Sequence, residues 1–344
     1  MAKFSNTKKP AFFIPFMDYK QSIGGVDYQD NLLNDIHLLN PTKTHKIEMS
    51  SITDFQYDIS ISNSVVYNSI SDSDGYVYLF ILGHNFHTRD CSMEVQLYNP
   101  DSDSYISYES RDNVVNDNSD WSSPNYNGFS IIKLKYSIDV FKGFRIIIRG
   151  FSSDSDGILK LGCVSLCSKW TPPHSPDLKL TMSREYDGVN TLETKGGATL
   201  SNAQYTRGGT FWASSYAWEL TGSDYEYDSN VISSQRTLGR RNWGLKFSYI
   251  NDSDLMPEFE SLTNYSTEFN YSQDKNIQQS KSFFARVLNR VQSSHIPFIF
   301  LPNDTDPNYN PDNWAITRFN QESFNIKQVA NSVYDISLKI REVW

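Results

Sequence analysis

The chain has 344 residues, a formal net charge of −9, 14% aromatic residues and 21% charged residues. The aromatic content excludes an intrinsically disordered chain, and the acidic balance without a basic stripe argues against a nucleic-acid partner. Arg240–Arg241 and Lys8–Lys9 are short pairs that we interpret as solvated surface charge. No apolar run reaches ~18 residues, so we expect no membrane insertion. The start of the chain lacks a signal-peptide core, which predicts a protein made in a cytoplasm.

Residues 1–45 are irregular and are expected to form an N-terminal arm. Pro10 and Pro15 bracket a short apolar segment, and Gly24–Gly25 and Pro41 interrupt the rest. Two interpretations stay open. The arm reaches onto a neighbouring subunit, or it packs as a lead-in strand on its own chain.

Residues 46–170 carry a dense series of strands separated by turns rich in Ser, Asp, Asn and Gly. Residues 76–82 form a continuous apolar run, as in a strand covered on both faces. Residues 132–136 alternate between apolar and polar side chains, as in a half-buried strand. Further strands are expected over 144–151 and 158–166. This spacing predicts an antiparallel β-sandwich or jelly roll.

Residues 171–177 contain three prolines and are expected to form a linker, since proline interrupts strand pairing and stiffens the chain. Residues 178–344 then form a second antiparallel β domain with one packed α-helix. The alternation over 334–341 predicts a terminal strand, and residues 314–319 and 324–329 are expected to pair as a hairpin.

The helix is predicted over residues 282–294. Its apolar stripe consists of Phe283, Phe284, Val287, Leu288 and Val291. Ser282 is the expected N-cap, and Arg286 and Arg290 are expected to face solvent.

The three cysteines are expected to be buried free thiols. Cys163 and Cys167 are four residues apart on a predicted strand, about 13 Å apart, which is too far for a disulfide. Cys91 is remote from both, and the spacing is not that of a zinc site.

Motifs for enzyme chemistry are missing from the sequence. There is no glycine-rich phosphate loop and no nucleophile elbow. His84 and His87 are close in sequence but lack a metal-binding frame, and they are interpreted as polar turn residues. We therefore expect no cofactor and no enzymatic activity.

Two weaker ligand hypotheses remain. Hard oxygen ligands in acidic turns could hold calcium, at Asp72, Asp74, Asp154 and Asp156, although the bidentate Glu of a full calcium loop is missing. The alternative is that these residues form solvated β-turns. Three aromatic residues near polar loops, Trp121, Tyr126 and Trp170, could stack on a sugar. The alternative is that each of them packs over a loop or a subunit interface.

Several phrases of the second half resemble uncharacterised virion proteins of tailed bacteriophages: LTMSREYDGVNTLETKGGATLSNAQY (180–205), GRRNWGLKFSYINDSDLMPE (239–258), HIPFIFLPN (295–303) and FNIKQVANSVYDISLKIREVW (324–344). The first half, ending in GILKLGCVSLCSKWTPP, resembles the galactose-binding-like jelly-roll modules of phage tail and baseplate proteins. The distal-tail family is the nearest architectural analogue.

The resemblance implies a structural protein of the virion tail, in the distal tail, baseplate or fibre-attachment region, assembled in the host cytoplasm. A homo-oligomeric ring built by the C-terminal domain and contacts with other tail or baseplate proteins are the expected partners. The alternative function is a glycan-binding module that recognises the host surface through the sandwich.

Overall fold

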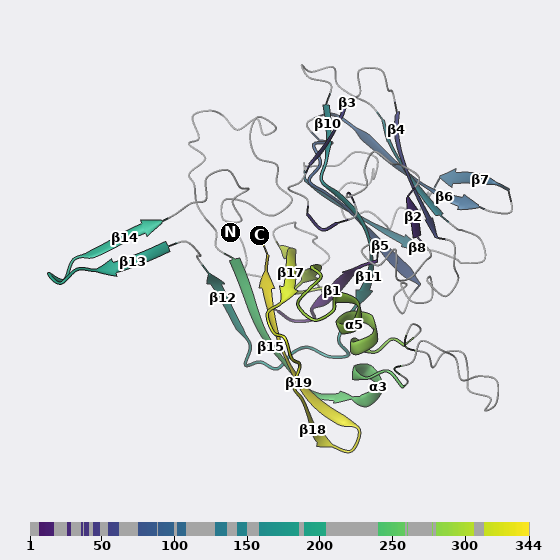
Figure 1. Cartoon of the computed structure of the whole chain (residues 1–344). Helices are drawn as coiled ribbons and strands as arrows, with labels where there is room; N and C mark the ends of the chain where they lie inside the picture. Colours follow the sequence, from purple (N-terminus) through teal and green to yellow (C-terminus); the bar gives the residue numbers. More distant parts are fainter. Residues whose placement is uncertain are drawn as a thin grey trace.

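The structure is a computed structural model of the chain (Figure 1). It describes residues 7–16, 26–28, 36, 38–40, 44–48, 54–61, 75–87, 89–99, 102–107, 128–135, 143–149, 158–185, 189–203, 240–258, 260, 277, 280–305 and 313–343.

A ten-stranded sheet runs through the molecule. Its strands lie in the order β12 (Thr181–Glu185), β15 (Arg240–Asn251), β19 (Val333–Glu342), β17 (Ala315–Phe319), β16 (Phe298–Leu301), β1 (Ala11–Pro15), β11 (Cys163–Trp170), β5 (Tyr76–Leu82) and β8 (Phe129–Lys135). The tenth strand, β18 (Ile326–Ala330), pairs with β19 off this path.

The remaining described strands form three smaller sheets. The five-stranded sheet has the order β2 (Val26–Tyr28), β4 (Asp54–Ile61), β9 (Gly143–Arg149), β6 (Ser92–Asn99) and β7 (Ser104–Ser107). Two separate pairs are β3 (His45–Glu48) with β10 (Ile158–Leu161), and β13 (Val189–Glu193) with β14 (Thr199–Ala203). Every described strand pair is antiparallel, so the chain is mainly β as predicted.

The first half forms the predicted β-sandwich. One end of the large sheet, β11–β5–β8, packs on the five-stranded sheet. Val77, Leu79 and Ile81 of β5 share a buried cluster with Tyr57 of β4 and Ile146 of β9. Both faces of β5 are covered, because Tyr78, Phe80 and Leu82 lie in a second cluster on the opposite face. This double coverage explains the continuous apolar run.

Strand β1 lies in the middle of the large sheet, between β11 and β16. Phe12 is opposite Trp170 on one side and Phe300 on the other. All five residues of β1 are buried. For residues 11–15 the structure therefore selects the packed lead-in strand over the arm on a neighbour. The predicted domain division stays a prediction, and the described strands on its two sides share one sheet through β1.

The helical segment packs on the part of the large sheet that contains β15, β19, β17 and β16. It comprises a π-helical part η5 (Phe284–Leu288) and α5 (Asn289–Val291), and a separate short helix α3 (Asp252–Leu255) follows β15. The Oγ of Ser282 accepts a hydrogen bond from the Ala285 N–H at 3.4 Å, as expected of an N-cap. The helix is packed, as predicted, because its apolar stripe lies in one buried cluster with Trp243, Leu245 and Phe247 of β15.

Two predictions about this half are wrong. Arg286 and Arg290 do not face solvent, since they are 4% and 8% exposed. Their guanidinium groups instead donate to the Ser280 carbonyl and to Ser168 Oγ, which stabilises burial of the charged heads. The expected pairing of residues 314–319 with 324–329 is also not formed. Strand β17 pairs with β16 and β19, and β18 forms its hairpin with β19.

Candidate functional site

Trp170 is the one residue of the predicted sugar platform that the structure describes. Its indole ring is partly buried and packs on Phe283, with ring centroids 4.8 Å apart, and on Phe12 at 5.6 Å. Its Nε1–H donates to the Lys281 carbonyl at 3.2 Å. Trp170 thus closes the edge of the core beside the helix.

The other predicted ligand residues lie outside the described residues. These are Trp121 and Tyr126 of the sugar platform, and Asp72, Asp74, Asp154 and Asp156 of the calcium hypothesis. Both hypotheses stay predictions. Among the described residues, no group of three or more His, Cys, Asp or Glu side chains is placed to hold a metal ion.

The three cysteines are buried free thiols, as predicted. Burial raises the pKa of the Cys91 thiol to about 12, which keeps it protonated and unreactive.

The sequence around His84 predicts a polar turn residue, and this prediction is wrong. His84 is fully buried, and its Nε2 lies 2.9 Å from Ser130 Oγ. The ring stacks on Phe86 at 4.1 Å between centroids. Burial lowers the pKa of His84 to about 3, so the side chain is neutral at physiological pH. Because Ser130 is also fully buried, this pair is part of the sandwich core and is closed to a substrate.

The outer face of the five-stranded sheet carries a ladder of paired charges. Arg145 makes a two-point ion pair with Asp58, at 2.6 and 2.7 Å. The same guanidinium lies 3.7 Å above the Tyr105 ring centroid. Further along the same strand β9, Arg149 forms an ion pair with Glu94 of β6. Since Arg145 covers one face of the tyrosine ring, this ladder stabilises the sheet rather than offering that face to a sugar.

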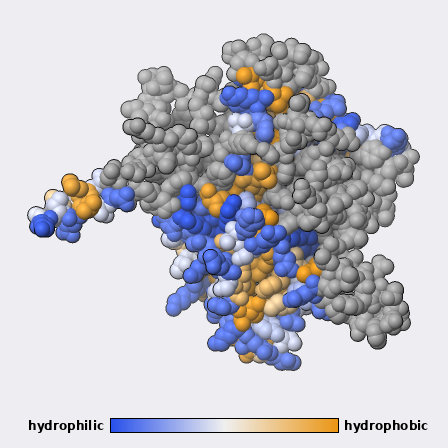
Figure 2. All heavy atoms as spheres, in the orientation of Figure 1, coloured by the Kyte–Doolittle hydropathy of each residue, from blue (hydrophilic) through white to orange (hydrophobic). Residues whose placement is uncertain are grey.

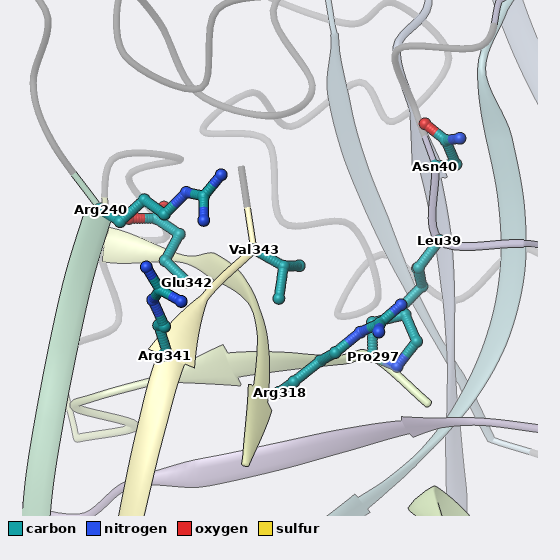
Figure 3. Close-up of a pocket in the computed structure, with 8 residues that line it drawn as sticks. All are labelled: Leu39, Asn40, Arg240, Pro297, Arg318, Arg341, Glu342 and Val343. Atoms are coloured by element: carbon teal, nitrogen blue, oxygen red, sulfur yellow. The ribbon is translucent and has the colours of Figure 1, made fainter. Parts of the chain in front are cut away.

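A pocket of about 370 Å³ lies at the end of the large sheet where β15 begins and β19 ends (Figure 3). Three arginines line it, namely Arg240 from β15, Arg318 from β17 and Arg341 from β19. Arg318 is exposed and extends toward Leu39 and Pro297 in Figure 3. The alternation of each strand places these arginines together, although they are far apart in sequence.

Two ion pairs fix the wall of this pocket. The carboxylate of Glu342 accepts from Arg241 Nε at 3.0 Å and from Arg241 Nη2 at 2.8 Å. Arg341 Nη2 lies 2.9 Å from a carboxylate oxygen of Glu185 on β12. The interpretation of Arg240–Arg241 as solvated charge is therefore wrong for Arg241, which is only 8% exposed. Three arginines and one glutamate line the pocket, so among the described residues its lining is cationic.

The hairpin β13–β14 projects away from the rest of the molecule (Figure 1). Leu192 and Leu200 are directly opposite each other across it, and they are 70% and 60% exposed. Figure 2 shows an apolar patch toward the tip of this projection. Thr194 and Ala198 close the turn, and Gly197 has a φ of 81°, a conformation that glycine adopts without strain.

Sequence reasoning did not single out this leucine pair, although a signal exists. Two runs with β-compatible residues flank Lys195–Gly196–Gly197, which is the pattern of a hairpin with a glycine turn. The sequence does not indicate that these leucines are exposed, because an apolar residue on a strand is normally expected in a core.

No family model and no curated protein matches this chain. No helix in the described ranges is long and apolar enough to cross a bilayer.

Proposed function

We propose that this protein is a structural component of a bacteriophage tail that acts by homo-oligomeric assembly, in the distal tail, the baseplate or a fibre-attachment ring. The observation that carries the assembly part is the projecting hairpin β13–β14 with its exposed leucine pair. The tail assignment comes from the resemblance of the sequence phrases to tailed-phage virion proteins.

The hairpin supports the assembly proposal because a hairpin of this kind has little stability by itself in water. An isolated two-stranded hairpin is at best marginally stable, and it becomes stable when one face packs on another surface. By strand alternation Leu192 and Leu200 share one face, whereas Thr191 and Ser201 share the other. One face thus carries the leucine pair at its centre, and the centre of the other face carries the Thr191–Ser201 pair, as expected of an arm that packs on a partner with one side.

An arm that leaves its own chain and docks on the next copy makes a heterologous contact. Repeated around a closing rotation, this contact builds a ring, and without closure it builds a filament. Both are architectures in which a tail component connects its neighbours. The proposed contacts with other tail or baseplate proteins then use the faces of the ring.

The experiment is to measure the mass of the purified protein by light scattering and to image it by negative-stain electron microscopy. A defined oligomer with a ring shape supports the proposal. A strict monomer at high concentration, in a protein absent from purified virions, would contradict it.

The alternative proposal is a glycan-binding module on the virion. Its predicted platform consists of Trp121, Tyr126 and Trp170, and packing of Trp170 against Phe12 and Phe283 makes this residue a weak contributor. A glycan array separates the two functions. Binding that Trp121→Ala removes supports host recognition, and an array that stays blank at millimolar sugar removes this alternative.

A further inference from the structure

We propose that the arginine pocket between β15, β17 and β19 binds an acidic segment of a second copy of this chain, residues 252–260, and so joins copies head to tail. This inference rests on the proposed assembly function and assigns a second contact to it, separate from the hairpin. The ligand class is a carboxylate-bearing peptide.

The chemistry of the pocket fits carboxylates. Guanidinium groups present several N–H donors in a plane and pair with carboxylates in a two-point geometry. Arg241 already makes such a pair with Glu342 in the wall of the pocket, at 2.8 and 3.0 Å. Arg318 is exposed at the mouth, and within the described ranges it makes no ion pair.

The rigidity of the wall favours binding. Arg341 forms an ion pair with Glu185 of the edge strand β12, and the Glu342 carboxylate accepts from the side chain and the backbone N–H of Arg241. Both glutamates are therefore occupied by arginines of the wall. An incoming carboxylate meets a preformed cationic surface around Arg318, which reduces the entropy lost on binding.

The acidic segment is at the other end of the same strand. Strand β15 begins with Arg240 and Arg241 and ends at Asn251, and Asp252, Asp254, Glu258 and Glu260 follow within nine residues. Asp252, Glu258 and Glu260 are exposed, and the segment contains no Lys or Arg. The eleven steps between the ends of β15, at about 3.3 Å each, separate them by up to about 36 Å. This is several screening lengths at physiological ionic strength.

The opposite charges at the two ends favour a second copy as the occupant. Within one chain the length of β15 separates the acidic segment from the pocket, so we expect the two to meet between copies. Figure 1 shows α3, which carries Asp252 and Asp254, at the opposite end of β15 from the end where β19 finishes. A contact between unlike ends is heterologous, as a ring or filament requires.

The test measures the dissociation constant of self-association of the full chain by analytical ultracentrifugation. Arg318→Glu, and separately Asp252→Arg with Glu260→Arg, should each raise this constant by about 10-fold or more. Combining the three substitutions in one chain should bring it back to within about 3-fold of wild type. Lys281→Glu, an equal charge change at an exposed site beside the helix, should leave it within about 3-fold.

Circular dichroism and urea unfolding check that each variant folds, and Arg318→Gln replaces Arg318→Glu if the latter does not. An unchanged dissociation constant for the pocket variants in an oligomeric protein overturns this inference and leaves the proposed function intact. The inference is also overturned if the combined variant has a dissociation constant as high as those of the single-site variants. A wild-type protein that never associates overturns both.

Discussion

Arg241 and Glu342 form a buried ion pair that joins β15 to β19 in the wall of the arginine pocket. Their side chains are only 10% and 9% exposed, and Arg241 also donates to the Trp314 carbonyl at 2.5 Å. Two strands that are about a hundred residues apart in sequence are thus connected by a charge pair that water barely reaches. The pair stabilises the wall of the pocket, and losing one partner leaves the other charge buried.

Replacing Glu342 by Gln should lower the free energy of unfolding by about 3–5 kcal/mol, because it leaves the Arg241 guanidinium buried without its counter-charge. Urea unfolding followed by tryptophan fluorescence measures the loss. The control is Glu185→Gln, whose side chain is 43% exposed in its pair with Arg341. That change should cost less than about 1 kcal/mol. Equal losses in the two variants would show that the Arg241–Glu342 pair is not effectively buried.

Replacing Phe12 by Ala should destabilise the protein by about 3–5 kcal/mol, because the ring is fully buried among other aromatic rings. Its centroid lies 5.3–6.3 Å from those of Trp170, Phe283, Phe298, Phe300 and Phe319. Calorimetry or urea unfolding gives the value. Met182→Ala, on the exposed edge strand β12, is the control and should change stability by no more than about 0.5 kcal/mol. A Phe12→Ala variant as stable as wild type would mean that β1 is a detachable arm.

The neutral state of His84 should make stability depend on pH. Because burial lowers the folded-state pKa of His84 to about 3, below the ordinary value of 6.5, the unfolded chain binds the extra proton between these values. Stability from this group is therefore complete above about pH 6.5 and is lost as the pH falls toward 3. The slope contributed by one proton is at most about 1.4 kcal/mol per pH unit.

Urea unfolding at several pH values between 6 and 4 tests this dependence. The free energy of unfolding of His84→Gln should fall less steeply over this range than that of wild type. His295→Gln, at an exposed position, should keep the wild-type slope. Parallel curves for wild type and His84→Gln would show that His84 titrates normally in the folded protein.

The sequence was sufficient for features that depend on local periodicity. The stripe Phe283–Val291 repeats at the helical period, and the alternation over 334–341 has the period of a strand, so both were predictable from neighbouring residues. The sandwich class also followed, because strand runs and turn residues alternate regularly along residues 46–170.

Features that depend on distant partners were not predictable. The place of β1 is set by pairing of Phe12 with Trp170 and Phe300, and nothing near Phe12 in the sequence indicates these partners. Burial of His84 depends on its polar partner Ser130, which is forty-six residues later in the sequence and is buried beside it. A charged residue such as Arg286 is expected to face solvent, but its guanidinium group donates to the carbonyl of Ser280. The candidate pocket likewise unites arginines of three separate strands.

The projecting hairpin gives the most direct test of the central claim, that this chain acts by self-assembly. Light scattering should give wild type a mass that is a defined multiple of the 39.5 kDa chain. Leu192→Asp with Leu200→Asp should give a folded protein that no longer forms the wild-type oligomer at the same concentration, because two charges on the apolar face cannot be buried against a partner. Thr191→Asp with Ser201→Asp, on the opposite face of the same hairpin, should keep the wild-type mass. If the leucine variant retained the same oligomer, or wild type were monomeric at every concentration, assembly through this hairpin would be contradicted.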